Sequence, residues 1–68
     1  MNEILFVVEE MSDGGFIAHA LGVSIITEAD DSESLYIQIR DAVHCHFSEE
    51  EIPLIIRLFF IREEIITV

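Results

Sequence analysis

The start of the chain has the pattern of two strands joined by a tight turn. The run from Ile4 to Glu10 is apolar until its two acids, and a second apolar run extends from Phe16 to Leu21. Between them stands Asp13-Gly14-Gly15, a combination typical of hairpin turns because glycine adopts the positive φ angles that such turns need. The sequence therefore predicts an antiparallel hairpin, with strands over about residues 3–10 and 15–21.

A third apolar run follows Gly22. It reads Val23-Ser24-Ile25-Ile26-Thr27-Glu28 and is rich in β-branched residues, which favour strands. Because both connections are short, the three strands are expected to form an antiparallel meander.

An amphipathic helix is predicted from near Ser32 to near Ser48. An Asp or Ser before it can cap the first turn, and Glu33 stands where the helix dipole favours a carboxylate. Apolar residues recur at helical spacing, at Leu35, Ile39, Ala42, Val43 and Phe47. They form one stripe that can lie on a sheet face.

The last predicted strand spans about Leu54 to Glu63, after Pro53 has disfavoured helix at the residue before it. A right-handed helical crossover should place this strand beside the first strand and parallel to it. We therefore expect a single α+β domain over residues 1–68. It would be a two-layer β-β-β-α-β fold, with a four-stranded, mostly antiparallel mixed sheet and one helix on one face.

The small size of the chain predicts self-association. A core made from 68 residues rarely leaves more than about 3–5 kcal/mol of net stability. Cys45 is the only cysteine and no structural-zinc spacing is present, so neither a disulfide nor a metal compensates. We expect a homo-oligomer, a dimer or higher.

Both faces of the predicted sheet are partly apolar, whereas one helix can cover only one face. The uncovered face is the expected subunit interface, with the candidate residues Leu5, Val7, Ile17, His19, Arg57, Phe59 and Ile61. The apolar segment from Ile65 to Val68 is expected either to add to a partner's sheet edge or to close over the core.

The charge of the chain is strongly unbalanced. Fourteen acidic residues stand against three arginines and no lysine, for a formal net charge of −11. Direct nucleic-acid binding is not expected, because it requires clustered Lys and Arg. Two interpretations of the acidic excess stay open: solubility through self-repulsion, and recognition of a basic partner.

Targeting and membrane segments are not evident. The N-terminus has no basic segment before its short apolar run, and no stretch approaches the roughly 20 apolar residues of a membrane span. We expect a cytoplasmic protein that does not bind a membrane.

No residue pattern predicts catalysis or metal binding. His44 and His46 flank Cys45, but on a helix the two histidines are about 200° apart and cannot hold one ion together. A metal-dependent nuclease would gather its carboxylates around one point, whereas these lie at strand ends and turns. Gly14-Gly15 lacks the helix and the lysine of a phosphate loop. We expect no enzyme activity, cofactor, metal or small-molecule substrate.

Taken together, these features resemble the N-terminal domain of HicB-like antitoxins. The resemblance rests on Val7-Val8-Glu9-Glu10, Asp13-Gly14-Gly15-Phe16-Ile17-Ala18, Gly22 with Ile26-Thr27-Glu28-Ala29-Asp30, Glu33-Ser34-Leu35 and Ile39-Arg40-Asp41-Ala42-Val43. It covers about residues 3–48. It implies a reduced ribonuclease H-like fold without catalytic carboxylates. It also implies a non-enzymatic module that binds and neutralises a small basic HicA-like toxin, which is an RNA-cleaving protein.

The resemblance implies that the partner-binding residues are the acids around the hairpin and the helix start: Glu9, Glu10, Asp13, Glu28, Asp30 and Asp31. An acidic surface of this kind steers association with a basic protein. Family members that repress their own operon carry a further C-terminal DNA-binding segment. The given sequence stops at Val68 after the last predicted strand, so operator binding is not expected. The alternative is a homo-oligomeric structural protein without a toxin partner.

Overall fold

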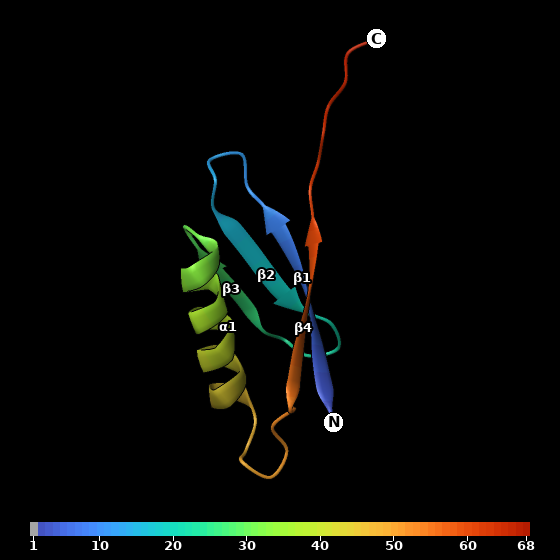
Figure 1. Cartoon of the computed structure of the whole chain (residues 1–68). Helices are drawn as coiled ribbons and strands as arrows, with labels where there is room; N and C mark the ends of the chain where they lie inside the picture. The colour runs from blue at the N-terminus through green and yellow to red at the C-terminus, as the bar shows by residue number, and fades with distance from the viewer. Residues whose placement is uncertain (1) are drawn as a thin grey trace.

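The computed structural model describes residues 2–68, and its elements follow one another in the predicted order (Figure 1). They are β1 (Glu3–Glu10), β2 (Phe16–Ala20), β3 (Ile26–Ala29), α1 (Ser32–His46) and β4 (Ile55–Ile61). No helix within the described range has the length and apolar character that crossing a membrane requires.

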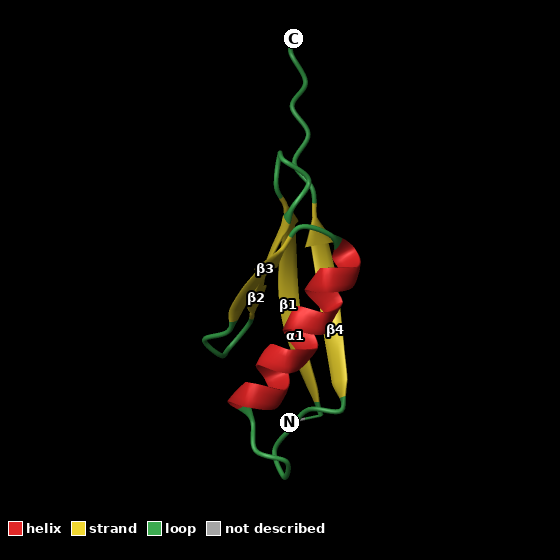
Figure 2. Cartoon of the chain, turned by 90° about the vertical axis from the view of Figure 1, so that its left-hand side faces the viewer, coloured by secondary structure: helices red, strands yellow, loops and turns green. Residues whose placement is uncertain are grey.

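The four strands form one sheet in the order β3-β2-β1-β4. β1 is antiparallel to β2, β2 is antiparallel to β3, and β4 lies parallel to β1. Figure 2 shows α1 lying across one face of this sheet, so the molecule has two layers. The predicted fold class, including the meander and the parallel crossover to β4, is confirmed.

The core lies between α1 and the sheet. Side chains alternate along a strand, so every second residue of β1 points towards the helix. The stripe of α1 meets them because its buried residues recur every four positions, which is the spacing of one helix face. The buried core consists of Ile4, Phe6, Val8, Ala18, Ala20, Ile25, Leu35, Ile39 and Val43. Ala42 and Phe47, the other members of the predicted stripe, pack against its rim.

The third strand is shorter than the sequence predicted. It begins at Ile26 and not at Val23. Gly22 adopts a φ of +87°, and the N–H of Ala20 donates to the carbonyl oxygen of Ile25, so a closed loop precedes the strand. Ile25 is buried in the core although it belongs to this loop. Its apolar character therefore reflects core packing and not strand pairing.

Strand β4 is also shorter than predicted, at Ile55–Ile61. The following residues, 62–68, extend away from the sheet and lengthen the molecule to 52 Å along its long axis (Figure 1). Ile65 and Ile66 are 83% and 87% exposed. Closure of this segment over the core of its own chain, one of the two expectations for it, is therefore wrong.

The sheet face opposite α1, called the outer face below, is not covered by another layer of the described residues (Figure 2). The strand register places on it Glu3, Leu5, Val7, Glu9, Ile17, His19, Ile26, Glu28, Ile55, Arg57, Phe59 and Ile61. All seven candidate interface residues lie on this face. Its residues on β1 and β2 are half-buried apart from Glu9, whereas Phe59 and Ile61 on β4 are exposed.

Candidate functional site

The hairpin turn between β1 and β2 is held by short hydrogen bonds. The N–H of Met11 donates to the carbonyl oxygen of Gly15 over 2.7 Å. The N–H of Gly14 donates to the carbonyl oxygen of Met11 over 3.0 Å. The carboxylate of Asp13 accepts from the N–H of Gly15 over 3.0 Å. Gly14 has a φ of +94°, which residues with a side chain rarely adopt. One carboxylate of the predicted set is thus fixed within the turn.

Gly15 brings this turn close to the end of β3. A Cβ atom at Gly15 would lie 3.2 Å from the carbonyl oxygen of Ala29, which is tighter than an ordinary contact. The next residue, Phe16, pairs with Ala29 across the two strands. The missing side chain therefore lets the turn lie close to the end of β3.

Asp31 is the N-cap of α1. Its backbone is extended, and its carboxylate accepts a hydrogen bond from the N–H of Ser34 over 2.7 Å. This bond is the main reason why the pKa of the Asp31 carboxyl lies below its ordinary value. Of the two residue types predicted for the cap, the structure selects Asp, and Glu33 stands in the first turn as predicted.

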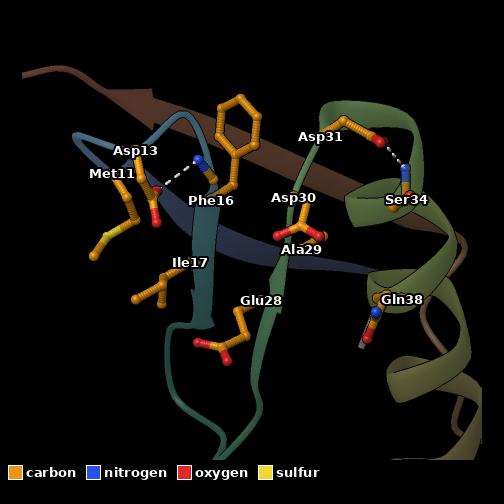
Figure 3. A pocket seen from close by; sticks show the side chains of 11 residues that line it. Met11, Asp13, Phe16, Ile17, Glu28, Ala29, Asp30, Asp31, Ser34 and Gln38 are labelled. Atoms are coloured by element: carbon orange, nitrogen blue, oxygen red, sulfur yellow. Dashed lines mark hydrogen bonds between the residues drawn. The ribbon is translucent and has the colours of Figure 1, made fainter.

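The turn, the end of β3 and the start of α1 surround a hollow of about 420 Å³ (Figure 3). The residues that line it are Met11, Asp13, Gly15, Phe16, Ile17, Glu28, Ala29, Asp30, Asp31, Ser34 and Gln38. Four of the six predicted partner-binding acids therefore meet here, and none of the described lining residues is basic. Asp13 and Asp31 are engaged by backbone N–H groups. Glu28 and Asp30 accept no hydrogen bond from the described residues, so their carboxylates are available to a ligand.

Apolar side chains stand among these carboxylates. Met11, Phe16 and Ile17 line the same hollow, and Ile17 pairs with Glu28 on the outer face (Figure 3). A Lys or Arg side chain matches this combination, because its aliphatic stem packs on apolar surface while its charged head hydrogen-bonds a carboxylate. The hollow is therefore suited to a cationic side chain of a partner protein.

The other two predicted acids lie at the end of β1. Glu9 pairs with Ile17 and is on the outer face, while Glu10 pairs with Phe16. Glu10 lines a second hollow together with Met11, Ser12, Arg62, Glu63 and Ile65. All six predicted acids thus lie at the same end of the sheet, the upper end in Figure 1.

Sequence reasoning missed three further acids at this end. β4 runs parallel to β1, so Glu63 and Glu64 follow it at the same end as the acids that finish β1. The predicted topology already contained this signal. The third missed acid is Glu33. The six predicted acids and these three make nine of the fourteen acids of the chain, called the acidic end below: Glu9, Glu10, Asp13, Glu28, Asp30, Asp31, Glu33, Glu63 and Glu64. Arg62 lies among them and forms an ion pair with Glu64.

The histidines lie away from the acidic end. His44 and His46 are exposed in the last turn of α1, on either side of the exposed Cys45. His19 is half-buried on the outer face. Within residues 2–68, no three or more His, Cys, Asp or Glu side chains are grouped so that they could hold a metal ion.

Known proteins similar to this chain include two that are each called UPF0150 protein. The one from Archaeoglobus fulgidus is 50% identical over 50 residues, which cover 74% of this chain and 74% of the relative. The one from Thermotoga maritima is 39% identical over 66 residues, which cover 97% of this chain and 93% of the relative. No family model matches the chain, and no solved structure matches it. By this identity and coverage, the chain belongs to the UPF0150 protein family.

Proposed function

We propose that this protein is a non-enzymatic acidic binding module that binds and neutralises a small basic, RNA-cleaving protein of the HicA-like kind. The observation that carries the proposal is the acidic end. Nine of the fourteen acids gather there, and four of them line one hollow. The HicB-like sequence pattern supports the same function independently of this geometry.

Neutralisation has a direct physical basis in this surface. A protein that cleaves RNA needs Lys and Arg side chains to contact the phosphates. A carboxylate-rich surface offers those side chains charge-assisted hydrogen bonds and so competes with RNA for them. The field of the acidic end also accelerates the encounter with a basic protein. Met11, Phe16 and Ile17 add apolar contact area beside the charges.

The partner can be obtained by affinity capture from cell extract at low salt, with a salt step for elution and mass spectrometry for identification. The decisive measurement is calorimetric titration of the purified partner against the wild type and a Glu28→Lys, Asp30→Lys double variant. These two carboxylates hold neither the turn nor the helix cap, so the variant should fold. We expect its affinity to fall about 30-fold or more, because two attractive charges become repulsive.

The matched control is the double variant Glu49→Lys, Glu50→Lys. It changes the net charge by the same amount at exposed positions after α1, at the other end of the molecule (Figure 1). Its affinity should stay within a few-fold of wild type. Equal losses in both variants would mean that only net charge matters. A complex that tolerates both the Glu28→Lys, Asp30→Lys change and high salt would overturn the proposal.

A homo-oligomeric structural role without a toxin partner is the second candidate. The observation that favours it is the large number of exposed apolar side chains on β4 and after it, including Phe59, Phe60 and Ile66. The two candidates differ in their response to salt, because screening weakens attraction between opposite charges but relieves repulsion between two acidic copies.

A further inference from the structure

Exposed apolar side chains are concentrated in one part of the chain. Eight of the thirteen large hydrophobic residues that the structure leaves exposed lie between residues 54 and 68: Leu54, Ile55, Phe59, Phe60, Ile61, Ile65, Ile66 and Val68. Five lie in all the rest of the described chain: Met11, Leu21, Ile26, Tyr36 and Ile37. An interface that covers most of the exposed apolar side chains must therefore include β4 and the residues after it.

β4 is an edge strand with an open side. It pairs with β1 on one side, and in the described part of the chain no strand pairs with the other. Natural edge strands are usually protected by lysine, proline or a bulge. In the seven residues of β4, Arg57 is the one charge, and there is no proline. A long apolar edge of this kind is a template for another strand.

Residues 64–68 have the composition of a strand without a partner. Ile65, Ile66, Thr67 and Val68 are all β-branched, a class that favours strands. They are exposed and extend past the end of the sheet (Figure 1). They continue the chain direction of β4, so each copy carries both an open edge and a segment that can pair with such an edge.

We propose that two copies of this chain associate through these edges. β4 and the residues after it run antiparallel to the same residues of the second copy, so that residues 64–68 of each copy pair with 58–62 of the other. A two-fold axis passes near Glu63, and the two four-stranded sheets become one continuous sheet. Such an interface is isologous and closes as a dimer. The inference goes beyond the proposed partner binding and does not depend on it.

The sequence selects this register. Residues opposite each other in a sheet must share a face. The allowed registers are therefore those that pair odd-numbered residues with odd-numbered ones and even-numbered residues with even-numbered ones. In the proposed register Ile65 faces Ile61, Ile66 faces Phe60, Thr67 faces Phe59 and Val68 faces Leu58. Every residue from Ile65 to Val68 therefore meets an apolar residue.

Charge supports the same register. It places Arg62 of each copy opposite Glu64 of the other, the two residues that already pair within one chain. These two opposite-charge pairs flank one like-charge pair, Glu63 with Glu63 at the axis. The neighbouring allowed register in one direction places Arg62 opposite Arg62. The neighbouring register in the other direction places Glu64 opposite Glu64 and Ile65 opposite Glu63. Opposite charges directly across a sheet stabilise it, whereas like charges destabilise it.

Association through the outer face alone is less favourable. The row across that face reads Glu28, Ile17, Glu9 and Ile61, so stacking two outer faces would bury carboxylates without basic partners. The edge pairing leaves Glu9 and Glu28 in water. Of the seven residues predicted for the interface, it uses Phe59 and Ile61 directly. The other five lie outside it: Leu5, Val7, Ile17, His19 and Arg57.

The test is sedimentation equilibrium of the wild type and of Ile66→Pro. Proline cannot donate to a strand ladder, and its ring disfavours regular pairing. The variant should fold, because Ile66 is 87% exposed in the single chain. We expect a wild-type dimer whose dissociation constant falls as salt rises, and an increase of about tenfold or more in that constant for Ile66→Pro. The control Ile26→Glu, at an exposed isoleucine on the opposite edge strand, should leave the constant within about twofold.

A cross-link fixes the register. In a Cys45→Ser background, Glu63→Cys should form a disulfide-linked dimer under mild oxidation, because the two positions are neighbours across the axis. Thr67→Cys is the control. Its two copies would be separated by about eight residues along the strand, or roughly 27 Å, and should not link.

Three outcomes would overturn the inference: a monomeric wild type in high salt, a dimer broken by Ile26→Glu but not by Ile66→Pro, or equal cross-linking at positions 63 and 67. Its failure and that of the proposed function are distinguishable. Dimerisation is measured on the protein alone and strengthens with salt, whereas the basic partner is released by salt.

Discussion

Asp31 combines a structural role with a place in the acidic hollow. Its carboxylate accepts the N–H of Ser34, which would otherwise lack a partner at the helix start. We expect Asp31→Ala to lower the midpoint of thermal unfolding by roughly 5 °C at neutral pH. The pKa of Asp31 is lowered in the folded chain, so its stabilising effect is present above its ordinary value of 3.8 and lost as pH falls through the lowered value.

The control is Asp30→Ala, which removes the same charge without removing a cap. Thermal melts of the wild type and both variants by circular dichroism, at neutral pH and at a pH below 3.8, separate the two effects. Asp30→Ala should melt no lower than wild type at neutral pH. The deficit of Asp31→Ala should shrink in acid. A deficit that is the same at both pH values would show that the carboxylate is not its source.

Individual residues were predictable from the sequence where their role is local. The Asp-Gly-Gly turn and an Asp or Ser cap follow from backbone geometry that a few neighbouring residues determine. The closeness of Gly15 to Ala29 was not predictable, because it depends on how β2 and β3 register against each other.

At the scale of the element, α1 is held by one face. Ile39 is 2% exposed and belongs to the core, whereas Ile37, two positions earlier on the same helix, is 58% exposed. We expect Ile39→Ala to reduce the free energy of unfolding by about 2–5 kcal/mol, because it leaves a cavity under the helix. Ile37→Ala should change it by less than about 0.5 kcal/mol. Urea unfolding of the two variants measures the difference, and similar losses in both would contradict this packing.

Element boundaries show where pattern reasoning failed. Val23-Ser24-Ile25 has the composition of a strand, but the positive φ of Gly22 and the bond from Ala20 to Ile25 close a loop there. β-branched side chains suit both buried loop positions and strands, so composition could not distinguish a loop from a strand here. Helical spacing over a longer segment is less ambiguous, and the stripe from Leu35 to Phe47 was predicted correctly.

For the whole molecule, the sheet order followed from the sequence because connection lengths and crossover handedness leave few topologies. The gathering of acids at one end follows from that topology, yet it was recognised for only six of the nine. Glu63 and Glu64 are distant in sequence from the hairpin and the helix start. Only the parallel pairing of β4 with β1 brings them to the same end of the sheet.

Crowding of like charge at the acidic end should destabilise the folded chain at low salt. Its acids lie within one end of a small domain. Salt of about 0.1 M is needed to screen the repulsion between carboxylates that are more than about 10 Å apart. We expect the midpoint of thermal unfolding to rise as salt increases from about 0.01 M to 1 M, since the screening length then falls from roughly 30 to 3 Å.

Asp30→Asn should raise the midpoint at low salt, and the gain should vanish at high salt. Asp41→Asn, on α1 beside Arg40 and away from the acidic end, should give little gain at either salt. Calorimetry on the three proteins measures these shifts. Equal gains for both variants would mean that total charge, and not its gathering at one end, determines the repulsion.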